Sequence, residues 1–225
     1  MIVLYEDNHL IAVYKQNSEI VQGDKTGDET LADSVKAYIK QAYNKPGDVY
    51  LGIAHRIDRP VSGVVLFART SKALARLNNM FRDGEIKKKY LAIIKERPPE
   101  DEAVIEHYLK KNEKKNKSFS HDREVKESKL AKLKYKILSR TDRYYLLDIE
   151  LYTGRHHQIR AQLSHIGCAI RGDLKYGYPR SNKDGGISLH ARSLEFVHPV
   201  KKEPVKIVAP LPKVDLWQLF KEHVE

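Results

Sequence analysis

The stretch YLGIAHRIDRPVSGVVLFART, residues 50–70, decides the fold. An apolar approach at residues 50–54 enters a polar turn, and an apolar run at residues 64–68 leaves it. This pattern predicts a strand, a tight turn and a second strand. The turn places Asp58 between basic residues, where a rigid backbone suits a catalytic or binding carboxylate. The open alternative is that Asp58 only bonds the backbone of its own turn.

A second informative stretch is LYTGRHHQIRAQLSHIGCAIRGDLKYG, residues 151–177. The alternating run before it predicts a half-buried strand, and the apolar spacing after Gly154 predicts a helix over residues 155–166 that ends before Gly167. Basic side chains at the helix start suit an anion. An ordinary amphipathic helix with solvated basic residues is the alternative.

Four ordered motifs resemble those of the RluA-type RNA pseudouridine synthases. HRIDRPVSG resembles the signature HRLD-x-x-TSG, and KKKYLAIIK resembles K-x-Y-x-A. TGRHHQIR followed by GDLKYG resembles the third motif, and LHARSLEFVHP resembles a late family segment. The resemblance runs from about Leu4 to Pro212, which is almost the whole chain.

The departures from the family pattern are few. Ile57 replaces the usual leucine and Val61 the usual threonine, and neither change removes a reactive group. The NKP-x-G segment of many relatives reads here as residues 14–17, YKQN. Substrate contacts of that loop are therefore not carried over to this chain.

The resemblance implies an α+β fold with a long bent sheet, mixed or antiparallel, flanked by helices and carrying an RNA cleft. It implies one catalytic domain over residues 1–225, without an appended N-terminal RNA-binding module. The pattern of the chain agrees with this fold class. The expected strands are residues 2–6, 10–14, 86–95, 133–139, 188–197 and 205–209, and the expected helices are 30–43, one capped by Ser71, and 214–224.

The implied reaction converts uridine to pseudouridine in structured RNA, either large-subunit ribosomal RNA, tRNA or both. The bond from uracil N1 to the ribose breaks, and the base rejoins the sugar through its carbon-5. No group is lost and no electrons are exchanged, so no cofactor and no metal are expected. Asp58 is the nucleophile by resemblance. Attack on the anomeric carbon, attack on carbon-6 and proton removal from the 2′ carbon all remain open.

Two further residues complete the expected catalytic set. Arg160, with Arg155 as the alternative, is expected to orient Asp58 and keep it ionised. Tyr90 is expected to stack on the uracil and relay a proton, unless it is only a core tyrosine. The residues expected to bind RNA are His55, Arg56, Arg59, Arg155, His157 and Lys89.

The composition agrees with this interpretation. Lysine and arginine number 41 against 30 acidic residues, and the formal net charge of +11 favours a polyanionic partner such as RNA. The chain has no apolar run long enough for a membrane span and no secretory signal pattern. The single cysteine, Cys168, excludes an internal disulfide and fits a reducing cytoplasm. A monomer is the default expectation for the oligomeric state.

Much of the positive charge lies between residues 110 and 136. The basic residues are Lys110, Lys111, Lys114, Lys115, Lys117, Arg123, Lys126, Lys129, Lys132, Lys134 and Lys136. They indicate either a solvated hairpin or an arm that follows RNA phosphates.

Three alternatives compete with this reading. His156, His157 and His165 could suggest a metal, but two adjacent helical residues point about 100° apart. A glycosidase would need a second carboxylate, and Asp173 is expected to bond its own loop. An RNA-binding protein or RNA chaperone with the same fold would not require Asp58, Tyr90 and Arg160 together.

Overall fold

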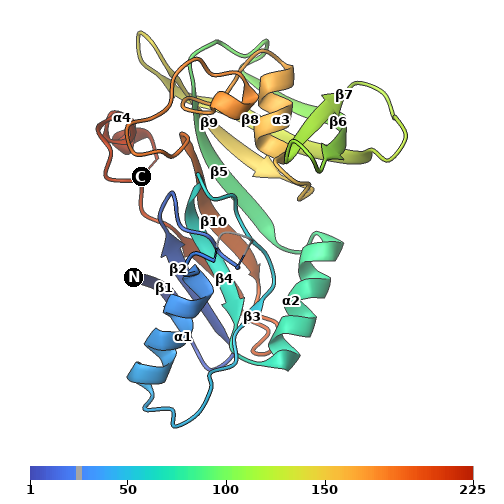
Figure 1. Ribbon diagram of the computed structural model, residues 1–225. Helices are drawn as coiled ribbons and strands as arrows, with labels where there is room; N and C mark the ends of the chain where they lie inside the picture. The colour runs from blue at the N-terminus through green and yellow to red at the C-terminus, as the bar shows by residue number, and fades with distance from the viewer. Residues whose placement is uncertain (24–26, 225) are drawn as a thin grey trace. The chain divides into compact units, whose positions relative to one another are not determined.

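The computed structural model describes residues 1–23 and 27–224, which form two compact units (Figure 1). The first unit contains residues 1–86 and 191–210, and the second contains residues 87–190 and those from 211 onward. In both units the strands outnumber the helices, and most strand pairs are antiparallel. The predicted α+β fold class is confirmed.

The first unit is built on strands in the order β1-β2-β4-β10, with β3 beside β4 and β11 beside β10. The elements are β1 Ile2–Glu6, β2 Leu10–Lys15, α1 Leu31–Ala42, β3 Gly52–Ile53, β4 Ser62–Ala68, α2 Ser71–Asp83, β10 Leu189–Val197 and β11 Pro204–Val208. Thr30 and Asp33 close the start of α1 as a capping box. The residue that caps α2 is Thr70 rather than the predicted Ser71, because the Thr70 hydroxyl accepts from the Ala73 amide at 3.2 Å.

Strand β4 is the centre of the first unit, and every residue in it is buried. Its second residue, Gly63, has a φ of +126°. A Cβ at this position would lie 2.2 Å from the Ala191 carbonyl oxygen of β10. Only glycine permits this close approach of two backbones, which explains the Ser-Gly pair that follows the Asp58 turn.

The second unit has strands in the order β5-β9-β8-β6-β7, and α3 packs against β6 and β7 (Figure 1). The elements are β5 Lys87–Ile94, β6 Glu102–Asn112, β7 Lys117–His121, β8 Lys129–Arg140, β9 Tyr145–Leu151, α3 Gln158–His165, α4 Asp215–Gln218 and the short helices Leu174–Tyr176 and Lys221–His223. The predicted closing helix over 214–224 is wrong. The chain forms two short turns of helix there, and Trp217 and Phe220 fill a core with Leu91, Ile93 and Leu146.

Helix α3 is shorter than the predicted helix over residues 155–166. It begins at Gln158 because His157 adopts a left-handed φ of +54° that cannot continue a helix. The Gln158 side chain accepts from the Arg155 amide and from the Thr153 hydroxyl, which orders the segment before the helix. Gly167, at φ +82°, lies just beyond the end of the helix as predicted.

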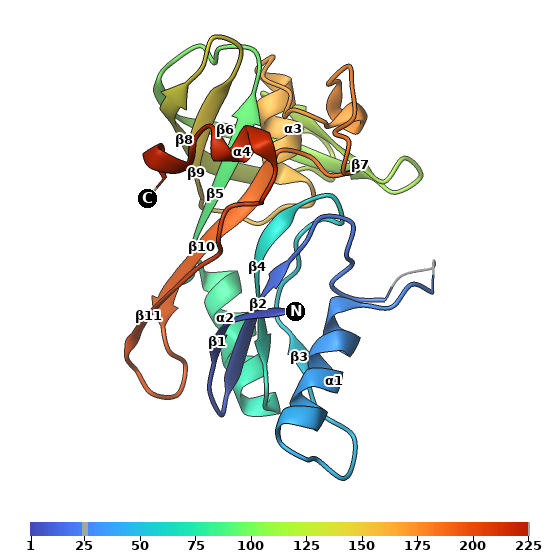
Figure 2. The same ribbon diagram turned by 90° about the vertical axis from the view of Figure 1, so that its left-hand side faces the viewer.

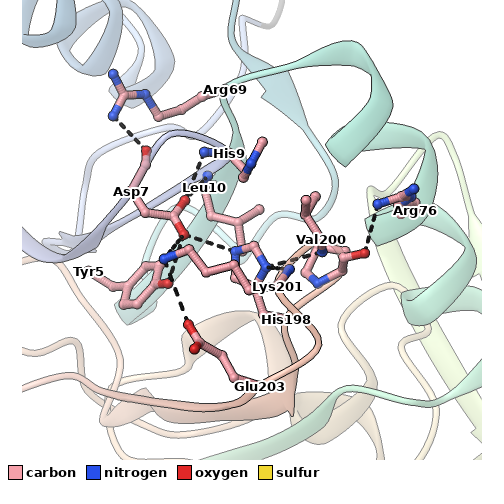
Figure 3. Close-up of polar contacts among 11 residues, drawn as sticks. Tyr5, Asp7, His9, Leu10, Arg69, Arg76, His198, Val200, Lys201 and Glu203 are labelled. Atoms are coloured by element: carbon pink, nitrogen blue, oxygen red, sulfur yellow. Dashed lines mark hydrogen bonds and ion pairs between the residues drawn. The ribbon is translucent and has the colours of Figure 1, made fainter.

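The largely buried carboxylate of Asp7 links two hairpins of the first unit, β1–β2 and β10–β11. Figure 2 shows the hairpins as ribbons, and Figure 3 shows the contacts of Asp7. Asp7 lies in the β1–β2 turn and accepts from the amides of His9 and Leu10 and from the Tyr5 hydroxyl. Its Oδ2 also lies 3.0 Å from His198 Nε2 and 3.0 Å from Lys201 Nζ in the β10–β11 turn. Burial opposes ionisation, but these donors together hold the pKa of Asp7 well below its usual range.

His198 is fully buried, and its Nδ1 accepts from the amides of Val200 and Lys201 at 3.1 and 2.9 Å. The imidazole proton therefore lies on Nε2, which faces Asp7. Burial lowers the pKa of His198 below the ordinary histidine value, although the Asp7 carboxylate opposes this shift. His198 thus orders the β10–β11 turn through Nδ1, while its Nε2 lies 3.0 Å from Asp7 Oδ2 of the other hairpin.

Replacement of Asp7 by asparagine tests this contact. Ionised Asp7 stabilises the fold above its unfolded-state pKa of about 4, and this contribution is lost as the pH falls below that value. We expect Asp7→Asn to lower the free energy of unfolding by about 1–3 kcal/mol at neutral pH, and the difference to narrow below about pH 4. Urea unfolding of both proteins at two pH values measures this.

Glu203→Gln is the matched control, because Glu203 is half-exposed and lies 3.7 Å from the same Lys201. It should change the unfolding free energy by less than about 0.5 kcal/mol. Equal stability of Asp7→Asn and the wild type at neutral pH would show that the two hairpins do not depend on this carboxylate.

Candidate active site

Asp58 lies in the connection between β3 and β4, in the first unit. The Val61 amide donates to the Asp58 carbonyl at 3.0 Å and closes the turn. Ile57 and Val61 on either side are buried, whereas Asp58 itself is half-buried. Apolar neighbours thus anchor the turn and leave the carboxylate at its surface.

The buried ammonium of Lys15 organises the backbone of this turn. Its Nζ donates to the carbonyl oxygens of Arg59 at 3.0 Å, Val61 at 2.7 Å and Gln16 at 2.9 Å. The side chain is 0 % exposed, and burial lowers the pKa of Lys15 to about 7, a shift that the carboxylates of Glu19 and Asp58 oppose. The three carbonyls match the three protons of an ammonium, so Lys15 is saturated by the turn that it supports.

The sequence alone does not reveal that Lys15 supports the Asp58 turn. The segment around Lys15 was noted only because it departs from the NKP-x-G pattern of relatives. The signal that could have revealed it is a single lysine at the end of the apolar strand LIAVYK. A charged residue in that position must find partners inside the fold.

The predicted RNA-binding residues of this turn differ in their surroundings. His55 Nε2 accepts from the Leu66 amide at 2.9 Å, and its ring stacks on Phe81 of α2. Arg59 donates to the Ser18 carbonyl and pairs with Asp28 at 3.1 Å. Arg56 is exposed, and in residues 1–23 and 27–224 its side chain has no hydrogen-bond or ion-pair partner. His55 and Arg59 therefore secure the turn, and Arg56 remains available to a ligand.

Tyr90 and Lys89 lie on opposite faces of β5 in the second unit. The register places Tyr90 beside Ile149 and Lys89 beside Glu150 of β9. The half-buried Tyr90 shares its face with residues that α3 covers, whereas Lys89 Nζ lies 3.0 Å from Asp148 Oδ2 on the other face. Lys89 is thus part of a cross-strand ion pair.

Arg160 forms a buried two-pronged ion pair with Asp173. Its Nε donates to Oδ2 at 2.7 Å and its Nη2 to Oδ1 at 2.9 Å, and both side chains are buried. The prediction that Asp173 bonds its own loop is wrong for the side chain, because the carboxylate accepts from Arg160. A bidentate pair fixes the plane of the guanidinium group.

The two histidines before α3 also have defined roles. The rings of His156 and His157 stack with centroids 3.8 Å apart, contrary to the expected divergence, because both residues precede the helix. His157 Nδ1 lies 3.0 Å from the Tyr176 hydroxyl, and His156 bonds Ser118 and Asn116. These contacts attach β7 to the start of α3.

Arg155 is the remaining predicted residue of this segment. It is exposed, and its Nε donates to the Leu130 carbonyl at 3.0 Å. Arg155 therefore lies at the surface beside β8, in contrast to the buried Arg160.

One cluster in the second unit has metal-ligand residue types. His107, Asp122 and His165 bring their ligand atoms within 4.8 Å of one another, with His165 Nε2 2.8 Å from Asp122 Oδ1. The Gln162 amide nitrogen lies 3.2 Å from His107 Nδ1 and also reaches the carbonyl oxygens of Ile105 and Ala131.

The basic segment divides into paired and solvated residues. Lys132 and Lys134 pair with Glu106 and Glu102 across the β6–β8 register, and Lys136 lies 3.8 Å from Glu102. At the β6–β7 turn, Lys114 and Lys115 are exposed, and among the described residues neither has an ion-pair partner. The strand lysines are therefore largely compensated, and the turn lysines are not.

None of the helices in the described part of the chain has the length and apolar character required to cross a membrane.

Comparison with known proteins establishes the class. Residues 9–165 match the family described as RNA pseudouridylate synthase, a range that includes Asp58, Tyr90 and Arg160. The chain is 32% identical over 221 residues to ribosomal large subunit pseudouridine synthase C of Buchnera aphidicola subsp. Baizongia pistaciae, which covers 94% of this chain and 67% of the relative. It is 30% identical over 239 residues to tRNA pseudouridine synthase C of Vibrio parahaemolyticus, which covers 96% and 92%.

The chain therefore belongs to the RluA-type RNA pseudouridine synthases, which are isomerases that act on RNA. Among solved structures, human RNA pseudouridylate synthase domain containing 4 shares the fold with a TM-score of 0.80. The sequence identity to that protein is 23%, and the match covers 98% of this chain and 92% of the human chain. The family predicted from the four motifs is confirmed.

Lys15→Met tests whether the Asp58 turn depends on the buried ammonium. The substitution keeps the length of the side chain but leaves three carbonyls without their donor, so we expect the free energy of unfolding to fall by about 1–3 kcal/mol. Because Asp58 is the expected nucleophile, we also expect pseudouridine formation to fall by at least about tenfold when its turn loses order. Urea unfolding and single-turnover assays measure the two effects.

Lys36→Met, in the exposed face of α1, is the control and should leave both quantities unchanged. A Lys15→Met protein with the activity and stability of the wild type would mean that the Asp58 turn holds its conformation by itself.

Proposed function

We propose that this protein isomerises specific uridines of large-subunit ribosomal RNA or tRNA, with Asp58 as the nucleophile. The observation that carries the proposal is the Asp58 turn, in which a family motif coincides with a carboxylate on a backbone secured by Lys15. Relatives named for each of the two RNA classes support the choice of substrates.

Asp58 suits the reaction because one carboxylate can begin each of the open routes. It can attack the anomeric carbon, attack carbon-6 of the base, or remove the proton from the 2′ carbon. The base then turns and rejoins the ribose through carbon-5, and a proton leaves that carbon. Atoms and electrons balance within the nucleotide, so the residues need to provide only a nucleophile, a proton relay and a pocket that retains the base.

Arg160 and Tyr90 are proposed as the other catalytic residues. In this proposal the Arg160 guanidinium group orients Asp58 and favours its ionised form, and Asp173 keeps the plane of that guanidinium group fixed. The Tyr90 ring offers a surface on which uracil stacks, and its hydroxyl can relay the carbon-5 proton. Arg56, exposed beside Asp58, is proposed to occupy the space that the target uridine leaves when it turns out of its stack.

The exposed turn between β6 and β7 is proposed as a phosphate contact. Lys114 and Lys115 lie there without acidic partners among the described residues, unlike the strand lysines. Unpaired surface ammonium groups bind phosphates by releasing counterions. Such contacts position RNA without reading its sequence.

The salt dependence of RNA binding tests this assignment. We expect Lys114→Met/Lys115→Met to reduce the slope of log affinity against log salt by about 1.4–1.8, because each phosphate contact contributes about 0.7–0.9. Lys134→Met/Lys136→Met removes the same formal charge from paired residues and should reduce the slope much less. If the two double variants had equal slopes of log affinity against log salt, RNA binding would depend on net charge alone and not on Lys114 and Lys115 in particular.

The central experiment measures tritium release from carbon-5 of labelled uridine, with tRNA and large-subunit ribosomal RNA tested separately. We expect the wild type to release tritium from at least one pool. Asp58→Asn should release none but should fold normally and bind the same RNA, because it keeps the shape of the side chain and removes its charge. Tritium release by Asp58→Asn would overturn the assignment of Asp58 as the nucleophile. No release by the wild type from either pool would overturn the assignment of tRNA and large-subunit ribosomal RNA as substrates.

A further inference from the structure

Lys88 is a buried lysine that the catalytic set leaves unused. It lies on β5 two residues before Tyr90, and its side chain is 8% exposed. Within residues 1–23 and 27–224 it has no hydrogen-bond or ion-pair partner. Burial lowers the pKa of Lys88, and no carboxylate acts against that shift.

The lysines around it are accommodated in ordinary ways. Lys87 Nζ lies 3.9 Å from Glu150, and Lys89 Nζ lies 3.0 Å from Asp148. Lys15, the other strongly buried lysine, donates to three backbone carbonyls. Lys88 alone in this group has neither an acid nor a carbonyl. A charge buried without compensation is costly, so its presence requires an explanation.

The register of β5 places Lys88 on the same face as Tyr90. Lys88 pairs with Leu151 and Tyr90 with Ile149 of β9, and alternate residues of a strand share a face. The two Cα atoms are therefore about 7 Å apart along the strand. Lys89, between them, points to the opposite face and its ion pair.

This face is the one on which α3 lies. Leu151 pairs with Leu133 of β8, and Ala131 lies two residues before Leu133 on the same face. The Gln162 side chain of α3 reaches the Ala131 carbonyl and His107. Leu151 is also the last residue of β9, three residues before Gly154 in the segment that leads to α3. Lys88 thus belongs to the face that carries Tyr90 and the Arg160 helix.

The ammonium group remains within reach of a ligand. Lys88 Nζ is not one of the fully enclosed polar atoms that lack a partner in the described part of the chain. Its stem is buried, and its end is accessible. An anion from outside the protein can supply the counter-charge that such an ammonium group lacks. RNA presents one phosphate for every nucleotide.

We propose that Lys88 binds a backbone phosphate of the substrate RNA next to the uridine that stacks on Tyr90. The inference rests on the proposed function, because it uses the same face and the same RNA. Lys88 then fixes the distance between the phosphate and the stacked base, a task that a surface lysine on a mobile stem performs poorly. The substrate phosphate supplies the counter-charge that the protein does not.

Lys88→Met and Lys87→Met form a matched pair of variants, because they remove the same charge from adjacent residues on opposite faces of β5. We expect Lys88→Met to reduce the salt slope of binding to an unmodified tRNA pool by about 0.7–0.9, which corresponds to one phosphate contact. Lys88→Arg should restore most of the slope, since a guanidinium group also binds phosphate. Lys87→Met should keep the slope of the wild type, because Lys87 faces Glu150 on the other side of the strand.

The stability of the free protein gives a second, independent readout. Lys88→Met removes an uncompensated buried charge, so its unfolding midpoint in urea should rise. The midpoint of Lys87→Met should stay nearly the same, because Lys87 is exposed and only 3.9 Å from Glu150. An unchanged salt slope in Lys88→Met, or an equal loss of slope in both variants, would overturn the proposal. A lower unfolding midpoint for Lys88→Met would also overturn it, because Lys88 would then have a partner in the free protein.

The proposed function and this inference fail in different ways. Absence of tritium release by the wild type would reject the assigned substrates, whereas the salt slopes would still report whether Lys88 contacts phosphate. Normal tritium release with identical slopes in wild type and Lys88→Met would reject the phosphate contact alone.

Discussion

The buried ammonium of Lys15 is the interaction on which the Asp58 turn depends. A turn exposes carbonyl groups that no strand satisfies, and here two of them belong to residues on either side of Pro60. Lys15 satisfies both from the end of β2 and adds the Gln16 carbonyl from its own loop. Because one charged group binds all three, the position of the Asp58 backbone is coupled to the core strand β2.

In the second unit, the charged side chain of Arg160 is held by an acidic side chain rather than by backbone carbonyl groups. Arg160 is held by the carboxylate of Asp173 through two parallel hydrogen bonds, and its guanidinium carbon lies 5.0 Å from the centroid of the Tyr176 ring. Tyr176 is in turn bonded to Ser118 and His157. A buried ion pair of this kind contributes little net stability, but it defines one orientation of the guanidinium group. Asp173 and Tyr176 of the GDLKYG motif thus orient the Arg160 side chain of the preceding helix, α3.

The sequence predicted the features that local patterns determine. The strands around the Asp58 turn, the start of a helix at Thr30 and the glycine after α3 follow from residue order alone. Lys15 could not be assigned because two of its three carbonyl partners are 44 and 46 residues away in the chain. The ion pairs of Lys132 and Lys134 with glutamates of β6 depend on the β6–β8 register, which no local pattern specifies. Helix α3 was predicted too long because nothing in RHHQ announces the left-handed backbone of His157.

Formal charge is a poor guide to which basic residues bind a polyanion. Lys87, Lys88 and Lys89 contribute equally to the net charge of +11, yet strand alternation gives them different environments. Lys87 and Lys89 face acids of β9, so much of their charge is already compensated. Lys88 faces the other way and is buried without an acid. Ion pairs with nearby acids reduce what a lysine gains from phosphate, so the residues that favour RNA most are those the fold leaves uncompensated.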